Sequence, residues 1–259
     1  MKYRYHRKIA KWVFVLCFCL LLFLAVFFVR QGKLGKETGD RAFGLKCEIV
    51  KTFDFSNDSS LKEWEEKVFK GKVSYSIEKK DGLSYVRASS DKAASALYYK
   101  INLDAKNNRP VMMWKWRADK FPVKTRSESL EVENEDDFAA RVYVIFPAMF
   151  ITNSKVLEYV WSEKLPVDTV GTSPYSGNIK LIVLEQGLTK DGTWVGEERD
   201  IYSDYLKLFG RPPEHNVGAI AFMTNTEHTG TNAEAVYDDI SIGYKAQVAA
   251  NEGGSKNEN

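Results

Sequence analysis

Aromatic side chains with strand-like spacing are the first candidates for binding chemistry in this chain of 259 residues. Trp114 and Trp116 are two residues apart, so in a β-strand both would point to the same face. Such a face is usually packed against the core, and the alternative is a platform on which sugar rings stack. Further aromatic residues that could extend this platform are Tyr143, Trp161, Tyr175 and Trp194.

Three arginines, Arg117, Arg141 and Arg199, lie in or beside segments whose pattern predicts strands. Arg141 alternates with Tyr143 in the otherwise apolar segment FAARVYVIF, so its guanidinium needs a partner. We expect either structural ion pairs or an Arg–carboxylate cluster that lines a pocket for an acidic sugar. The acids available as partners are Asp136, Asp137, Glu185, Glu198 and Asp238.

Paired carboxylates keep an enzymatic alternative open. Glycoside hydrolases need two carboxylates beside the scissile bond, and the acids that could supply them are Asp136, Asp137, Glu185 and Glu198. Residues 131–135 (EVENE) match the E-x-D-x-E strand of laminarinase-like sandwiches poorly, because the inner spacer is Asn134 and the surroundings are typical of a loop. The acidic stretch 121–138 has no strand pattern, and so long a loop is usually functional or disordered.

Histidine, cysteine and glycine patterns argue against several cofactors. His215 and His228 are isolated in the sequence, and two unpaired histidines do not indicate a Ser–His–Asp triad. The sequence contains no H-x-x-x-H, C-x-x-C or glycine-rich phosphate loop, so we expect neither zinc nor a nucleotide cofactor. His228, in TNTEHTG, is expected to be a turn residue at the surface.

A structural calcium ion is the one cofactor that we consider. Asp54 lies near the start of the predicted domain, and Asp238 and Asp239 lie near its end. Calcium needs six to eight oxygen ligands, so backbone carbonyls would have to join these carboxylates. The alternative is that these acids at strand ends face water.

The elements that position these residues are mostly strands. Alternating apolar and polar residues with β-branched or aromatic enrichment predict eleven strands, at 49–55, 73–79, 83–89, 94–102, 111–117, 138–146, 156–162, 178–186, 193–199, 217–224 and 235–242. Two short helices are expected at 59–67 and 201–209, after the capping residues Asn57 or Asp58 and Asp200. We therefore predict an all-β, two-sheet sandwich of the jelly-roll type.

Charge and cysteine content limit the possible partners. Residues 1–30 contain six basic residues and no acid, which leaves 31 basic and 35 acidic residues after them, a net charge of about −4. Such a domain does not suit nucleic-acid binding, which depends on neutralising phosphates. Two of the three cysteines, Cys17 and Cys19, lie in the N-terminal apolar run, so the predicted domain with Cys47 has no internal disulfide.

The N-terminal segment predicts membrane attachment. Residues 12–29 form an uncharged apolar run that is long enough to span a bilayer, and the basic segment 1–11 should stay on the cytoplasmic side. An uncleaved signal anchor is favoured over a cleaved signal peptide, because no small-residue cleavage pattern follows the run. We expect a single-pass protein with a linker at 30–47, a domain at 48–245 in the periplasm or outside the cell, and a disordered tail at 246–259.

Several short motifs occur in an order that resembles the bacterial family known as domain of unknown function 3047. They are FDF and LKEW near residue 53, SALYYKI at 95–101, WKWRAD at 114–119, DDFAARVYVIF at 136–146, EYVWS at 158–162, SPYSGN at 173–178, MTNTEHTG at 223–230 and VYDDI at 236–240. The resemblance implies an exported sandwich similar to galactose-binding-like and carbohydrate-binding modules, with no reaction implied. Asn225, Glu227 and His228 depart from the more acidic MTDTDNTG of the family.

The function that these patterns favour is a membrane-anchored extracytoplasmic module that binds a glycan or a cell-envelope polymer without catalysis. A glycoside hydrolase or polysaccharide lyase that uses paired carboxylates is the alternative. A structural partner of an envelope protein complex is the second alternative, because it needs no pocket. Resemblance of fold alone does not choose among these three.

Overall fold

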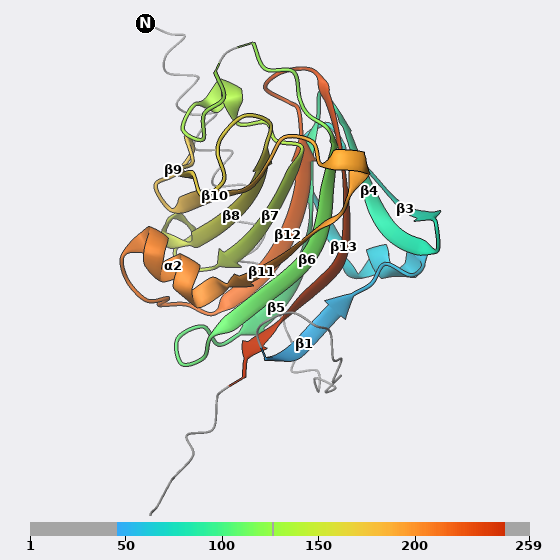
Figure 1. Cartoon of the computed structure of the whole chain (residues 1–259). Helices are drawn as coiled ribbons and strands as arrows, with labels where there is room; N and C mark the ends of the chain where they lie inside the picture. The colour runs from blue at the N-terminus through green and yellow to red at the C-terminus, as the bar shows by residue number, and fades with distance from the viewer. Residues whose placement is uncertain (1–45, 126, 247–259) are drawn as a thin grey trace, which may run out of the picture.

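The computed structural model describes residues 46–125 and 127–246, and these residues form a two-sheet β-sandwich with one α-helix (Figure 1). The all-β sandwich is thereby confirmed. The predicted anchor at 12–29, most of the linker and all but the first residue of the tail lie outside the described residues. No helix within the described ranges is long and apolar enough to cross a membrane.

The first sheet, sheet A, is built around one long strand, β13 (Asn232–Lys245), which pairs with β6 on one side. On its other side β13 pairs first with β4 and then with β1, so Asp238 and Asp239 lie where one partner gives way to the next. The order is β11-β6-β13-β4-β3. The remaining bounds are β1 (Cys47–Phe53), β3 (Ser74–Lys80), β4 (Leu83–Asp91), β6 (Pro110–Lys120) and β11 (Val195–Asp200).

The second sheet, sheet B, has the order β2-β5-β12-β7-β8-β10-β9. Its strands pair antiparallel except for β8 and β10, which are parallel. Their bounds are β2 (Glu65–Lys70), β5 (Ala94–Leu103), β7 (Ala140–Phe146), β8 (Lys155–Ser162), β9 (Val170–Thr172), β10 (Ile179–Gln186) and β12 (Val217–Asn225). The chain changes sheet between β5, β6 and β7 and again between β11, β12 and β13, as an interleaved sandwich requires.

The two helical predictions had different outcomes. Helix α2 (Ile201–Phe209) begins at Asp200, whose carboxylate accepts the backbone N–H of Ser203, and ends at Gly210 with φ of 70°. The helix predicted at 59–67 is wrong beyond its first turns. Asn57 caps a 3-10 helix (Asp58–Glu63), and the chain then enters β2 at Glu65.

The core lies between the sheets and contains one side-chain set from most of the strands, with no buried residue from the edge strands β2 and β9. Because side chains alternate along a strand, Ile220 and Phe222 of β12 join this core, while Ala219, Ala221 and Met223 point to the outer face of sheet B. The same alternation divides β7 and β8. The outer face therefore carries Arg141, Tyr143 and Glu158, and this is where the candidate site lies.

Candidate functional site

The tryptophans predicted as a stacking platform lie in the core. Trp114, Trp116 and Trp161 are 0% exposed, and the Trp116 and Trp161 rings pack 5.4 Å apart between the two sheets. The shared face of Trp114 and Trp116 is therefore the inner face, and neither side of these rings is open to a sugar. These side chains stabilise the sandwich through buried apolar area.

The remaining predicted binding residues divide between two sides of the molecule. On sheet A, the Arg117 guanidinium lies 5.3 Å from the half-buried Trp194 ring and pairs with Asp119 at 2.5 Å. At the start of α2, Arg199 donates to both oxygens of Asp204, at 2.9 and 2.6 Å. The residues that meet on the outer face of sheet B are Arg141, Tyr143 and Tyr175.

The aspartates predicted to bind calcium lie in different environments. Asp54 is exposed and accepts the backbone N–H of Ser56 at 3.1 Å. Asp239 has a positive φ of 50° and forms an ion pair with Lys115 at 2.9 Å. Within residues 46–125 and 127–246, the three carboxylates of Asp54, Asp238 and Asp239 do not form a cluster of close potential ligands.

Arg141 is the centre of a buried ion-pair network on the outer face. Its guanidinium contacts Glu158 of the neighbouring strand through Nε at 2.5 Å and through Nη2. Nη2 also donates to the Asp136 carboxylate at 2.9 Å, and Nη1 donates to the Asp136 carbonyl and to Asn225 Oδ1. All five N–H donors of an arginine are accounted for by these contacts. Arg141 therefore organises the site and has no donor left for an acidic sugar.

Asn225 connects this network to the turn that follows β12. Its Oδ1 accepts from Phe138 N and from Arg141, and its Nδ2 donates to the Asp136 carbonyl. Nδ2 also lies 2.9 Å from Asp137 Oδ1 and 3.0 Å from Glu227 Oε2. Only an amide can both accept and donate in this way. The asparagine at position 225 thus has a structural reason.

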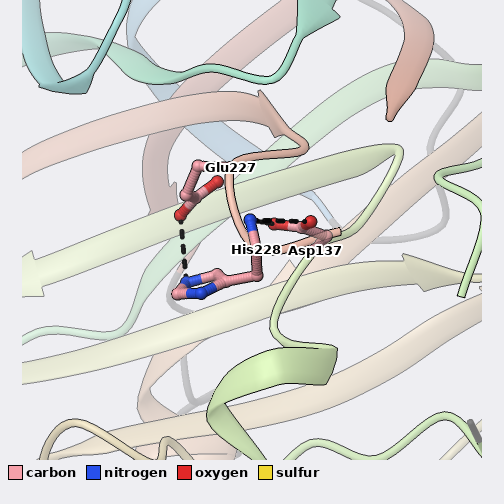
Figure 2. A group of neighbouring side chains, drawn as sticks. All are labelled: Asp137, Glu227 and His228. Carbon is pink, nitrogen blue, oxygen red and sulfur yellow. Dashed lines mark hydrogen bonds and ion pairs between the residues drawn. The ribbon is translucent and has the colours of Figure 1, made fainter. Parts of the chain in front are cut away.

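Asp137 holds the turn itself. It is 0% exposed, and its carboxylate accepts the backbone N–H groups of His228 at 3.1 Å and Thr229 at 2.6 Å. Figure 2 shows that the His228 ring then extends away from Asp137 toward Glu227. Asn225 fixes the carboxylates of Asp137 and Glu227, and these two groups hold His228 in a defined orientation.

His228 and Tyr175 form the part of the site nearest to solvent. His228 Nε2 lies 3.3 Å from Glu227 Oε1 and 2.5 Å from the hydroxyl of the half-buried Tyr175. The two rings are nearly parallel, with centroids 6.0 Å apart. The prediction that His228 lies in a turn is confirmed, but its ring packs in the site and is only 18% exposed.

Burial and paired charges shift the protonation of this cluster. Burial raises the pKa of Glu158 to about 7 even though Arg141 opposes the change, and burial likewise raises the pKa of Glu227. Burial lowers the pKa of His228, but the hydrogen bond and charge of Glu227 outweigh it and the pKa rises overall. Shifts of this kind gather at functional sites and also in structural networks.

Asp137, Glu227 and His228 are the one group of potential metal ligands found in the described ranges, with ligand atoms within 4.8 Å of one another. Both oxygens of Asp137 already accept N–H groups, and the Glu227 oxygens face Asn225 and His228. A cation would have to break the contact between Glu227 and His228. The donors present therefore fit a hydrogen-bonded turn better than a metal centre.

A second carboxyl pair lies at the edge of the sandwich. Glu185 of β10 and Glu197 of β11 share a hydrogen bond, and Trp116 Nε1 donates to Glu197 at 3.1 Å. Burial and the neighbouring Glu185 raise the pKa of Glu197 to about 7. The prediction named Glu198, whose side chain points to the other side of β11.

Sequence reasoning found Arg141 and its neighbour Asp136 but missed Glu158, Glu197 and the central position of Asn225. A usable signal existed for Glu158. Like Arg141, it is a charged residue within an apolar strand segment, and such a residue needs a partner when buried. Pairing of the two strands then places Arg141 beside Val160 and Tyr143 beside Glu158.

Comparison with known proteins confirms the family resemblance. A protein-family model described as "Protein of unknown function (DUF3047)" matches residues 62–241. No curated protein shows significant sequence similarity to the chain.

Solved structures with similar folds are distant in sequence. The family 11 carbohydrate-binding module of a Clostridium thermocellum cellulase is 12% identical, with 81% of this chain and 100% of that chain covered and a TM-score of 0.40. The CBM22-1 xylan-binding domain of Paenibacillus barcinonensis Xyn10C is 9% identical, with 80% and 100% covered and a TM-score of 0.39. A cellulase derived from Rhodothermus marinus Cel12A is 12% identical, with 70% and 95% covered and a TM-score of 0.40.

Proposed function

We propose a glycan-binding role for this chain, which belongs to the DUF3047 family, and we assign the binding surface to the outer face of sheet B. The observation that carries the proposal is an apolar cluster on that face. It comprises Ala96, Tyr143, Ile145, Val156, Ala219, Ala221 and Met223, with Phe69, Tyr98 and Ile179 half-buried at its edge. The seven clustered residues are at most 6% exposed, so Phe69, Tyr98 and Ile179 are the members that are open to a ligand. The outer face of a sandwich is usually polar, and partly exposed apolar residues gathered there favour a ligand or partner surface.

The register of the strands places two tyrosines in one row across this face. Tyr98 of β5, Ala221 of β12 and Tyr143 of β7 stand directly opposite one another across three neighbouring strands. The Cα atoms of the two tyrosines are therefore roughly 10 Å apart. Ala221 is 2% exposed and Tyr143 is 6% exposed, so other side chains cover this part of the row. Tyr98 is half-buried, and its ring is the one on which a sugar would stack.

Polar groups at the edge of the cluster suit a ligand rich in hydroxyl groups. The Tyr98 hydroxyl donates to Glu65 at 2.5 Å, and Lys100 pairs with the other oxygen of Glu65 at 2.5 Å. A sugar hydroxyl can both donate and accept, so it can replace either contact. Tyr175 and His228 provide a second polar border beside the buried network.

Binding without cleavage is supported by the state of the acids on this face. Asp136 and Glu158 are tied to Arg141, and Asp137 is occupied by backbone amides. A general acid or nucleophile must be able to reach the scissile bond. These side chains hold the surface in shape and have no open approach to a substrate.

The test is binding of the full chain to a panel of plant, microbial and envelope glycans, measured with and without calcium. Tyr98→Ala should weaken binding to any positive glycan at least tenfold, because stacked aromatic residues dominate such interfaces. Tyr202→Ala is the matched control, since Tyr202 is half-buried on α2, away from this face. Equal affinities of the two variants, or no binding to any glycan, would contradict the proposal.

A carbohydrate-active enzyme is the second candidate, and the carboxyl pair Glu185–Glu197 favours it. One of these groups carries a proton near neutral pH, as a general acid requires. Release of new reducing ends or unsaturated sugars by the full chain, abolished by Glu197→Gln, would support the enzyme. Release that survives both Glu197→Gln and Glu185→Gln would exclude this pair.

The sequence prediction of export leads to a proposal about location. The uncharged run at 12–29 anchors the chain in a membrane, and the sandwich lies in the periplasm or outside the cell. The run of basic residues before it supports this orientation. Protease added to intact spheroplasts should degrade the sandwich. Protection until the cells are lysed would contradict the proposal.

A further inference from the structure

An exposed apolar tip lies in the loop between β7 and β8. Met149 is 77% exposed and Phe150 is 69% exposed, which makes them the two most exposed large hydrophobic side chains in the described part of the chain. Leu206 of the adjacent helix α2 is also exposed. Adjacent apolar side chains that are exposed to solvent indicate a surface that contacts a membrane or another protein.

The two ends of this loop pack against helix α2. Phe146, just before the loop, packs against Tyr205 of α2 with ring centroids 4.8 Å apart. Lys155, just after the loop, places its Nζ 5.2 Å from the ring centroid of Phe209. Both ends of the loop are therefore fixed on α2, and the exposed tip has a defined position.

This tip lies at the end of the sandwich where the described chain begins. Lys46 accepts the backbone N–H of Ala246 at 2.7 Å, and Lys245 donates its own to Arg109 at 2.9 Å. The Arg109 side chain in turn contacts Asp200, the residue that caps α2, at 2.8 Å. Figure 1 shows the start of β1 and helix α2 at the same, lower end of the molecule.

A short segment connects the apolar run at 12–29 to the start of the described domain. Only residues 30–45 separate the uncharged run at 12–29 from the first described residue. These sixteen residues reach at most about 55 Å when fully extended. If the run is held in a bilayer, the linker joins that bilayer to the end of the domain that carries β1 and α2.

Basic side chains border the tip. Burial lowers the pKa of Lys155, the charges of Arg211 and Lys180 lower it further, and the charge of Glu214 opposes them. Lys207 on α2 is exposed, and Arg211 forms an ion pair with Glu214 at 2.9 Å. Basic residues beside an apolar tip suit the anionic headgroups of a phospholipid surface.

We propose that Met149 and Phe150 insert into the interfacial region of an anionic phospholipid bilayer. The strands of the sandwich then run toward the membrane, and the turn that carries His228, at the opposite end of β12, faces away from it. This orientation rests on the predicted anchor at 12–29 and is independent of glycan binding. It leaves both outer sheet faces open to a polymer beside the membrane.

The experiment measures how fast a single cysteine reacts with a membrane-impermeant maleimide. The full chain, with Cys17, Cys19 and Cys47 replaced by alanine, carries Phe150→Cys and is reconstituted at one copy per nanodisc of phosphatidylethanolamine and phosphatidylglycerol. The matched control is Leu188→Cys, because Leu188 is 65% exposed and follows β10 at the opposite end of the sandwich. Labelling after denaturation normalises both rates.

We expect the cysteine at position 150 to react several-fold more slowly than the one at position 188. The difference should shrink when Met149 is also replaced by serine, because the weakened tip leaves the interface more often. Equal rates at the two positions would overturn the proposal, as would failure of the chain to enter nanodiscs. Loss of glycan binding alone would leave these rates unchanged, which separates the two proposals.

Discussion

At the scale of single residues, the site is organised from the inside outward. Arg141 is saturated by Asp136, Glu158 and Asn225. Asn225 also donates to the carboxylates of Asp137, before β7, and of Glu227, in the turn after β12. Each step uses a buried polar atom that has no access to water and must therefore be paired. The residue that combines the largest number of roles is the neutral one, Asn225.

Asn225→Asp is expected to destabilise the fold by about 3 kcal/mol or more, because it leaves a buried carboxylate facing other acids. Its amide nitrogen now donates to Asp137 and Glu227, and an oxygen in that place would repel both. Chemical denaturation followed by circular dichroism measures the free energy of unfolding. Asn153→Asp is the control at an exposed position and should change stability by less than about 0.5 kcal/mol. An equal, small effect of both substitutions would contradict the assigned role.

The sequence predicted the members of this site better than their arrangement. Arg141 and Tyr143 share a face by strand alternation, and this was predictable. The facing partner Glu158 comes from β8, and the contact depends on a strand pairing that local pattern does not specify. For the same reason, alternation could place Trp114 and Trp116 together but could not decide whether their face was inside or outside.

At the scale of elements, β13 holds sheet A together by pairing with three strands. Gly243 lies where β1 crosses it, opposite Ile49. A Cβ at this position would lie 2.1 Å from the carbonyl oxygen of Glu48 and 2.8 Å from the Cα of Ile49. Only glycine allows this approach of two backbones.

Gly243→Ala should detach β1 while the rest of sheet A stays paired. The expected result is faster amide hydrogen exchange across Cys47–Phe53, with little change in β6 and β4, measured by mass spectrometry. Gly177→Ala is the control, because no atom lies within 4 Å of a Cβ built there. Unchanged exchange in β1 would show that the two strands accommodate the added methyl group without losing their pairing, and would contradict this role of Gly243.

Eleven of the thirteen strands in the described ranges were predicted because their alternation is strong. The two that were missed are the edge strands of sheet B, β2 and β9. Every residue of β2 is at least partly exposed, and its sequence EEKVFK has few apolar positions to alternate. Three-residue β9 is too short to carry a period. An edge strand has a neighbour on one side and buries fewer of its side chains. Its sequence therefore shows a weaker alternation of apolar and polar residues.

At the scale of the whole molecule, buried carboxyl groups make stability depend on pH in two opposite ways. Burial raises the pKa of both Glu158 and Glu197 to about 7. Hydrogen bonds and ion pairs with arginine or lysine outweigh burial at Asp119 and Glu128, whose pKa values are lowered. The first pair favours the folded state at low pH, and the second pair favours it at high pH.

The midpoint of thermal unfolding should therefore be highest near pH 5. Between about pH 4.5 and 7 the folded chain holds protons on Glu158 and Glu197 that the unfolded chain has lost, so stability falls as pH rises. Below about pH 4, protonation of Asp119 and Glu128 in the unfolded chain lowers stability again.

Glu197→Gln removes one of the two groups that favour low pH, because a neutral amide occupies the place of the protonated acid. The loss of stability between pH 5 and 8 should shrink by an amount on the order of 2 kcal/mol. Glu198→Gln, on the opposite side of β11, is the matched control and should keep the full dependence. Calorimetric scans of both variants across this range measure the effect. If Glu197→Gln retained the same slope as the unaltered chain, the proton would have to reside on Glu185, and the assignment of the acid in this pair would be reversed.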